Sequence, residues 1–264
     1  MLLANRTVVV SGVGAGLGRE VAAVCVREGA RVVLGARTRE NLAACAAAVD
    51  PDGTRSAYRV TDIGDEEQCA RLAELAVERF GGLDAVVHVA ALDTVMGGLE
   101  DADFAEWQRV LDVNLLGTLR MTRACLPALR EAGARGDGSV VMIGTQSSVA
   151  APTEVRQAAY AASKGALVSA MYSLARELGP YGVRVNTVQP GWMWGPMVEG
   201  YVAWAAESEQ VPHQAVRQRL DARMALPRMA EDGDVAETVA FFASARSRGI
   251  TGQCLMVNAG ELMR

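Results

Sequence analysis

The sequence predicts an α/β domain in which one doubly wound parallel sheet of about seven strands carries helices on both faces. Three observations predict it: short β-branched segments recur along the chain, segments with helical periodicity separate them, and a glycine-rich turn follows the first segment. Strands that alternate with helices are typical of parallel sheets, because each parallel connection has to cross the sheet. The chain has 264 residues and no linker or repeat, so we expect a single domain over residues 1–264.

The expected strands are continuous apolar runs, as burial on both faces requires. They lie at residues 7–11, 31–35, 56–60, 85–89, 139–144, 183–188 and 254–257. After the first strand, Val21, Val24 and Cys25 have helical spacing, and Gly29 is expected to end that helix. Residues 192–227 are too long for a plain connection, so we expect a helical insertion that serves as a substrate lid.

Composition and charge exclude several classes of function. The chain has 26 Lys and Arg against 31 Asp and Glu, and an acidic protein without basic clusters is unsuited to binding nucleic acid or an anionic membrane. The five cysteines are scattered and the two histidines lie in no cluster of metal ligands, which favours a reduced, cytoplasmic protein without disulfides or a metal site. No apolar run approaches the roughly 18 residues of a membrane span, and no signal peptide is recognisable.

The turn after the first strand has the sequence Ser-Gly-Val-Gly-Ala-Gly-Leu-Gly over residues 11–18. Glycines let the backbone approach a pyrophosphate, and the N-terminus of the next helix offers free N–H groups and a positive dipole end. A glycine-rich turn alone is weak evidence, but its place in the first strand–turn–helix unit favours a dinucleotide site. The expected contacts there are Ser11, Gly12, Gly14, Gly16, Leu17 and Gly18.

The end of the second strand indicates which dinucleotide binds. An acidic residue at this position favours the ribose 2′-OH of NAD(H), whereas this chain has Ala36 followed by Arg37. A guanidinium pairs with a 2′-phosphate, so we expect NADP(H) to be preferred, with NAD(H) possible. The alternative is that Arg37 is only a solvated loop residue, and Ala15 stands where a second basic residue would strengthen the prediction.

Tyr160 and Lys164 are four residues apart at the start of a strongly helical segment and therefore share one helix face. A phenol with its ordinary pKa of about 10 is a poor base near neutral pH, and a neighbouring ammonium favours its ionised form. By itself, a Tyr–Lys pair with this spacing is usually two surface residues that come together by chance and have no function. Downstream of a dinucleotide loop and of a buried strand followed by Ser and Thr, it indicates proton transfer.

These motifs resemble those of the short-chain dehydrogenase/reductase family, in its single-domain NAD(P)-dependent branch with a Rossmann-like fold. The resemblance covers nearly the whole chain, and its features occur in the family's order: the glycine loop, Asp62, Asp112-Val113-Asn114, Tyr160/Lys164 and Pro190-Gly191. It implies that Tyr160 exchanges a proton with the substrate oxygen, that Lys164 lowers the pKa of Tyr160 and binds the nicotinamide ribose, and that Asn114 holds a relay water. It also implies cofactor contacts at Asp62, Ile63, Ala90, Ala91, Tyr160, Lys164, Pro190, Gly191 and the backbone N–H of Met193.

The chain departs from the family pattern in two places. The Asn-Asn-Ala-Gly of the family is His88-Val89-Ala90-Ala91 here, and we expect His88 to be a structural hydrogen-bonding substitute rather than a catalyst. The substrate-binding hydroxyl is expected directly after the fifth strand, which gives Thr145, and also thirteen residues before the tyrosine, which gives Ser147. Because both rules cannot hold, we choose Ser147, with Thr145 next and Ser148 third.

Three of the four tryptophans, Trp192, Trp194 and Trp204, lie in the expected lid. Such a lid suits an apolar or cyclic alcohol or ketone, although the same residues would equally pack the lid onto the sheet or a second subunit. The helix of Tyr160 is rich in Ala, Ser and Gly and permits close helix–helix approach. The resemblance implies that such helices pair between subunits, so we expect a homotetramer or, failing that, a homodimer.

The leading hypothesis is an NADP(H)-dependent oxidoreductase that interconverts a secondary alcohol and a ketone by hydride transfer. An epimerase or dehydratase is disfavoured because the chain is too short for an added substrate domain, and a serine hydrolase because it has no G-x-S-x-G motif. The alternative from another class is a cofactor-binding sensor on the same fold that has no turnover. Replacement of the Tyr or the Lys would be the sequence sign of such a sensor, and this chain has both residues.

Overall fold

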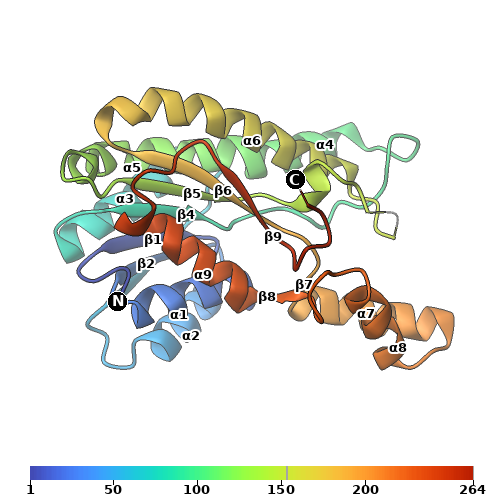
Figure 1. Ribbon diagram of the computed structural model, residues 1–264. Helices are drawn as coiled ribbons and strands as arrows, with labels where there is room; N and C mark the ends of the chain where they lie inside the picture. The colour runs from blue at the N-terminus through green and yellow to red at the C-terminus, as the bar shows by residue number, and fades with distance from the viewer. Residues whose placement is uncertain (153, 264) are drawn as a thin grey trace.

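A seven-stranded sheet forms the centre of the computed structural model, which describes residues 1–152 and 154–263 (Figure 1). Its strand order is β3-β2-β1-β4-β5-β6-β9, and every neighbouring pair is parallel. The strands are β1 (Thr7–Ser11), β2 (Arg31–Ala36), β3 (Ser56–Val60), β4 (Ala85–His88), β5 (Ser139–Ile143), β6 (Arg184–Pro190) and β9 (Cys254–Val257). The seven expected strands are therefore present, and the predicted α/β class with a doubly wound parallel sheet is confirmed.

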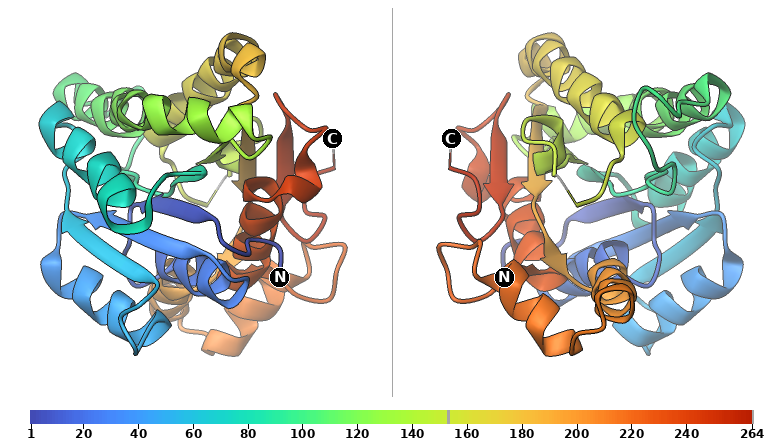
Figure 2. Two further views of the ribbon diagram at one scale, coloured as in Figure 1. Left: turned by 90° about the vertical axis from the view of Figure 1, so that its left-hand side faces the viewer. Right: turned by 90° about the vertical axis from the view of Figure 1, so that its right-hand side faces the viewer.

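Helices cover both faces of this sheet (Figures 1 and 2). One layer consists of α1 (Leu17–Arg27), α2 (Arg39–Val49) and α9 (Asp232–Ala243). The opposite layer consists of α3 (Glu66–Phe80), α5 (Thr118–Ala134) and α6 (Ala158–Leu178), with α4 (Phe104–Leu111) packed beside α6. A π-helical segment, Asp112–Gly117, joins α4 to α5, and short 3₁₀ turns lie at Gln146–Ser148, Gly179–Tyr181 and Ala245–Ser247. None of the helices in the described ranges has the length and apolar character needed to cross a membrane.

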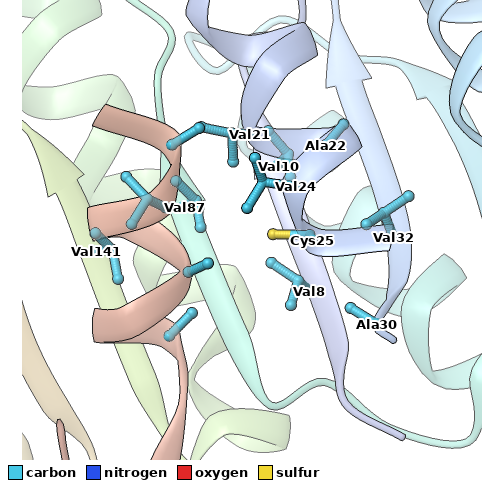
Figure 3. Close-up of a cluster of buried hydrophobic side chains, with 14 of the residues drawn as sticks. Val8, Val10, Val21, Ala22, Val24, Cys25, Ala30, Val32, Val87 and Val141 are labelled. Carbon is cyan, nitrogen blue, oxygen red and sulfur yellow. The ribbon is translucent and has the colours of Figure 1, made fainter. Parts of the chain in front are cut away.

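Two hydrophobic cores lie on the two faces of the sheet because side chains alternate along each strand. Toward α1, the buried residues include Val8, Val10, Val32, Val87 and Val141 (Figure 3). Their sequence neighbours Val9, Val33, Val86 and Val140 are buried on the other face, against α3, α5 and α6. This double burial explains why the inner strands are continuous apolar runs.

The two edge strands do not follow that rule. Tyr58 and Val60 of β3 and Leu255 of β9 are exposed large side chains. An edge strand has only one strand neighbour, and here the flanking helices leave its outer positions open to solvent. The expectation of complete burial on both faces therefore holds for the five inner strands and fails at the edges.

Residues 192–227 project beyond the sheet as two helices, α7 (Pro196–Glu209) and α8 (His213–Asp221), drawn in orange in Figure 1. They share a small apolar core that includes Val202, Val216 and Leu220. A two-residue parallel pair, β7 (Met193–Trp194) with β8 (Ala230–Glu231), joins both ends of this excursion to the rest of the fold. The excursion thus begins and ends beside the carboxyl end of β6.

Candidate active site

A groove of about 430 Å³ lies at the carboxyl ends of the strands, beside β1 and β4. The strand order reverses between β1 and β4, and open parallel sheets bind ligands at this switch point. Eleven of the residues predicted to contact a dinucleotide line the groove: Ser11, Gly12, Gly14, Gly16, Leu17, Gly18, Arg37, Asp62, Ile63, Ala90 and Ala91.

The glycine loop has little room for side chains on its inner side and an open outer side. Gly12 has a φ of +106°, and a Cβ there would overlap the backbone nitrogen of Ala90. A Cβ on Gly18 would overlap the carbonyl oxygen of Gly12, whereas one on Gly14 would meet no described atom within 4 Å. The loop therefore presents bare backbone and the N-terminus of α1 to the groove, and this arrangement fits a pyrophosphate.

The far end of the groove is formed by Ala36, Arg37, Thr38 and Asn41, after β2. Arg37 is exposed and has no ion-pair partner among the described residues. No carboxylate stands at position 36 to repel a phosphate. The residues at this end therefore fit a ribose that carries a 2′-phosphate.

A second and larger cavity, of about 1190 Å³, adjoins the groove, and Asp93 lines both. Three of the predicted cofactor contacts, Tyr160, Gly191 and Met193, line this cavity rather than the groove. Residues 192–227 contribute Trp192, Met197, Tyr201 and Trp204, with Trp192 and Tyr201 ring centroids 5.0 Å apart. The predicted lid segment thus forms a mostly apolar wall next to Tyr160.

The other two predicted cofactor contacts, Lys164 and Pro190, are buried and line neither the groove nor the cavity; Lys164 is 1% exposed. Its Nζ donates a hydrogen bond to the carbonyl oxygen of Ile143, at the end of β5, over 2.7 Å. Burial lowers the pKa of Lys164 to about 8, although the charge of Asp93 opposes this shift. The ammonium lies 5.8 Å from the centroid of the Tyr160 ring.

The pKa of Tyr160 is raised above its ordinary value, mainly by burial and further by the charge of Asp93, while a hydrogen bond with the Thr145 side chain acts in the opposite direction. This direction differs from the expectation that Lys164 lowers the pKa of Tyr160. The physical reason is that burial of the phenol dominates its pKa, while the Lys164 ammonium donates its hydrogen bond to the Ile143 carbonyl. A phenol of this kind keeps its proton at neutral pH and is suited to donate it.

Of the three candidate hydroxyls, Thr145 is the one that contacts the Tyr160 phenol. Ser148 donates its hydroxyl to the Thr145 carbonyl over 2.7 Å, which removes it from the cavity. Ser147 lines the cavity, but its hydroxyl has no hydrogen-bond partner among the described residues. The geometry thus favours Thr145 over Ser147, because the 3₁₀ turn Gln146–Ser148 adds residues between the strand and Tyr160.

The Asn114 side chain is buried, and both of its amide heteroatoms make hydrogen bonds to protein groups. Its Oδ1 accepts from the Leu92 backbone N–H over 2.7 Å, and its Nδ2 donates to the Leu92 carbonyl and to Ser163 Oγ. The π-helical segment places Asn114 between the loop after β4 and helix α6. A relay water at Asn114 would have to use acceptor capacity that these contacts leave over.

His88 is buried at the end of β4, with Nε2 2.9 Å from the hydroxyl of Thr122. Burial, with a smaller effect of the Lys164 charge, lowers the pKa of His88 to about 3, so its ring is neutral at physiological pH. These contacts are those of a structural hydrogen-bonding residue. In the described ranges, no three His, Cys, Asp or Glu side chains form a potential metal site, and the five cysteines are free thiols.

Comparison with known proteins places the chain in a family. A family model described as enoyl-(acyl carrier protein) reductase matches residues 12–261. The A-factor type γ-butyrolactone 1′-reductase (1S-forming) of Streptomyces virginiae is 32% identical over 98% of this chain and 96% of its own length. The cis-4-hydroxycyclohexanecarboxylate dehydrogenase of Sinomonas cyclohexanicum is 32% identical over 97% and 96%, respectively.

The crystal structure of actinorhodin polyketide ketoreductase with NADPH superimposes with a TM-score of 0.84, at 29% identity, over 96% of this chain and 95% of that one. These matches extend over the glycine loop, the Tyr160/Lys164 pair and the lid together. The chain belongs to the short-chain dehydrogenase/reductase family. These two relatives and this ketoreductase are oxidoreductases by name.

Several residues of the cavity escaped the sequence analysis: Asp93, Gln146, Arg223 and Glu261. Asp93 lies two residues after Ala91, a predicted cofactor contact, so its position after the fourth strand could have predicted that it lies near the reacting groups. Gln146 links the loop after β5 to Glu261 over 2.9 Å. Arg223 and Glu261 come from distant parts of the chain, and no local pattern predicts that they meet.

Proposed function

We propose that this chain is an NADP(H)-dependent oxidoreductase that interconverts a secondary alcohol and a ketone, with residues 1–264 acting as one catalytic domain and 192–227 as its substrate lid. The observation that carries the proposal is the position of Tyr160. Its phenol contacts Thr145 and lies where a dinucleotide groove adjoins a cavity with an aromatic wall. The relative that is named as a hydroxycyclohexanecarboxylate dehydrogenase supports a cyclic substrate.

The groove residues, among them Gly12, Gly18 and Arg37, would hold NADPH, which would supply the hydride for the carbonyl carbon. Tyr160 donates its phenolic proton to the carbonyl oxygen, and the Thr145 hydroxyl holds that oxygen in place. Lys164, held by the Ile143 carbonyl, provides positive charge beside the phenol as it gives up its proton. The lid excludes water from the cavity, and Asn114 positions the loop after β4 against α6.

The choice of hydroxyl is tested by Thr145→Ala and Ser147→Ala. We expect Thr145→Ala to lower kcat/KM for a ketone by about 100-fold, because it removes a preorganised hydrogen bond to the developing charge. Ser147→Ala should change kcat/KM by less than about threefold. Ser147 contacts Thr145 through its backbone N–H, which the substitution keeps, and its hydroxyl makes no hydrogen bond to a described residue. Thr145→Ser, which keeps the hydroxyl, is the matched control, and a larger loss in Ser147→Ala than in Thr145→Ala would restore the choice of Ser147.

Cofactor preference is tested by Ala36→Asp. A carboxylate at the end of β2 would repel the 2′-phosphate near Arg37, and we expect the ratio of kcat/KM with NADH to that with NADPH to rise about 10- to 100-fold. Ala36→Asn, which has the same shape without the charge, should change the ratio much less. An unchanged ratio in Ala36→Asp would show that this end of the groove does not discriminate between the two cofactors.

The function itself is tested by following nicotinamide absorbance with NADPH and NADH against a panel of cyclic and aromatic ketones. Turnover that prefers NADPH supports the proposal. Binding of the cofactor without turnover of any ketone or secondary alcohol would contradict it and favour a cofactor-binding sensor on this fold.

We also propose a cytoplasmic homotetramer, with a homodimer as the smaller alternative. The small residues Ala161, Gly165, Ala166 and Ala170 on α6 are only partly buried, and Tyr172 on the same helix is exposed, which leaves a helix face for a second copy. Light scattering of the purified protein tests this, and a monomer would contradict it.

A further inference from the structure

The wall of the 1190 Å³ cavity carries more negative than positive charge. Its charged lining residues are four carboxylates, Asp93, Asp101, Glu154 and Glu261, and two guanidiniums, Arg156 and Arg223. Two negative charges are therefore left over, in a cavity whose remaining wall is rich in Trp, Tyr and Met side chains. Low-dielectric walls of this kind strengthen the field of the charges that they enclose.

Arg223 is not free to bind an anionic substrate. Its guanidinium lies 2.8 Å from a carboxylate oxygen of Glu154 and forms an ion pair with Glu261, whose side chain is 7% exposed. It also lies over the Trp192 ring, 5.7 Å from the centroid. One guanidinium between two carboxylates leaves this end of the cavity with a net negative charge.

The charges of Arg156 and Asp101 largely cancel at the rim. Asp101 accepts a hydrogen bond from the backbone N–H of Gly98 over 2.7 Å, and Arg156 is exposed nearby. The pKa of Asp101 lies below its ordinary value, first because of the Gly98 hydrogen bond and in a smaller part because of the Arg156 charge. The rim therefore offers no unopposed positive charge.

Asp93 supplies the second excess charge of the lining, at the reacting end, and the charge of the buried Lys164 ammonium, which does not line the cavity, opposes it in part. It lines both the dinucleotide groove and the cavity, and no described side chain donates a hydrogen bond or an ion pair to its carboxylate. Its charge acts on both Tyr160 and Lys164. A substrate whose carbonyl reaches Tyr160 therefore lies beside an unpaired carboxylate.

We infer that this cavity selects neutral or cationic cyclic compounds against carboxylates, and that Asp93 is the main discriminating residue. The inference rests on the proposed function for the identity of the substrate cavity, and it names the charge of the substrate. It also separates this chain from the Sinomonas relative, which is named for a carboxylate substrate.

Binding of three unreactive probes tests the inference without any turnover. The probes are cyclohexanecarboxylate, cyclohexylmethanol and cyclohexylmethylammonium, which share a ring and differ in charge, and titration calorimetry at pH 7 with saturating NADPH measures each Kd. We expect the carboxylate to bind about tenfold or more weaker than the alcohol, and the ammonium to bind at least as tightly as the alcohol. Equal affinities, tighter binding of the carboxylate, or no binding of any probe at millimolar concentration would overturn it.

Asp93→Asn locates the effect, because it removes the charge and keeps the shape. It should reduce the ratio of carboxylate to alcohol Kd by about tenfold. Asp52→Asn makes the same charge change at an exposed residue of the turn between α2 and β3, and it should leave the ratio unchanged. If Asp93→Asn also leaves the ratio unchanged, the assignment to Asp93 is wrong.

Selective binding without ketone turnover would contradict the proposed function alone, whereas turnover of neutral ketones without charge selectivity would contradict this inference alone.

Discussion

Tyr160→Phe is expected to lower kcat for ketone reduction by about 10²- to 10⁴-fold, the range that a positioned general acid contributes. The variant keeps the ring that lines the cavity and loses only the hydroxyl that contacts Thr145. NADPH binding should therefore stay within about twofold of the parent protein. Stopped-flow or steady-state absorbance at the nicotinamide band measures the rate, and titration of NADPH fluorescence measures the binding.

Tyr172→Phe provides a matched control for this experiment. Tyr172 lies on the same helix and is exposed, and its hydroxyl is 3.9 Å from the sulfur of Cys254, outside both cavities. Its loss should leave kcat unchanged. A Tyr160→Phe variant that keeps most of its activity would show that another group supplies the proton, and loss of NADPH binding would show that the phenol holds the cofactor instead.

Lys164→Met should lower kcat by about 10²-fold and remove a step from the pH profile. The pKa of Lys164 lies near 8, below its ordinary value, because the ammonium is buried. The residue is therefore charged below pH 8 and loses its proton above it, so the reduction rate of the parent protein should fall as the pH rises through about 8. The variant has no ammonium to titrate, and this fall should be absent.

Methionine fills a similar volume to the lysine stem, so the melting temperature of Lys164→Met reports whether the fold is intact. A folded variant that still shows the fall near pH 8 would assign that titration to another group. A folded variant with unchanged kcat would remove Lys164 from the proton-transfer machinery and leave it as a residue that only braces Ile143.

The strands and the dinucleotide groove were predictable because their determinants are local. Buried inner strands need uninterrupted apolar residues, and Gly12 and Gly18 stand where nearby backbone atoms leave no room for a Cβ. The pair β7 and β8 has two residues in each strand, too few for any propensity to register. The exposed positions of β3 and β9 depend on which strands lie at the edges of the sheet, and the residues of a strand do not predict its place in the strand order.

Within the candidate site, the sequence predicts that Tyr160 and Lys164 lie on one helix face, but it does not predict which group the Lys164 ammonium hydrogen-bonds. Helical spacing places two side chains on one face, whereas the direction of the Lys164 ammonium depends on a carbonyl 21 residues earlier, at Ile143. The count along the chain gives Ser147, whereas the geometry favours Thr145, because a 3₁₀ turn takes up residues after Thr145. The charged residues that line the cavity lie between positions 93 and 261, and only the tertiary structure brings them together, so no local pattern predicts the net charge of the cavity.

The π-helical segment Asp112–Gly117 bears on how this chain can change during evolution. A π-turn holds one residue more than an α-turn, so deletion of a single residue here would let α4 and α5 merge into one regular helix. The same deletion would rotate Asn114 by about 100° relative to α5 and take its amide away from Leu92 and Ser163. Leu116, in contrast, is exposed. Descendants of this sequence should therefore keep the number of residues in this segment more strictly than their kinds.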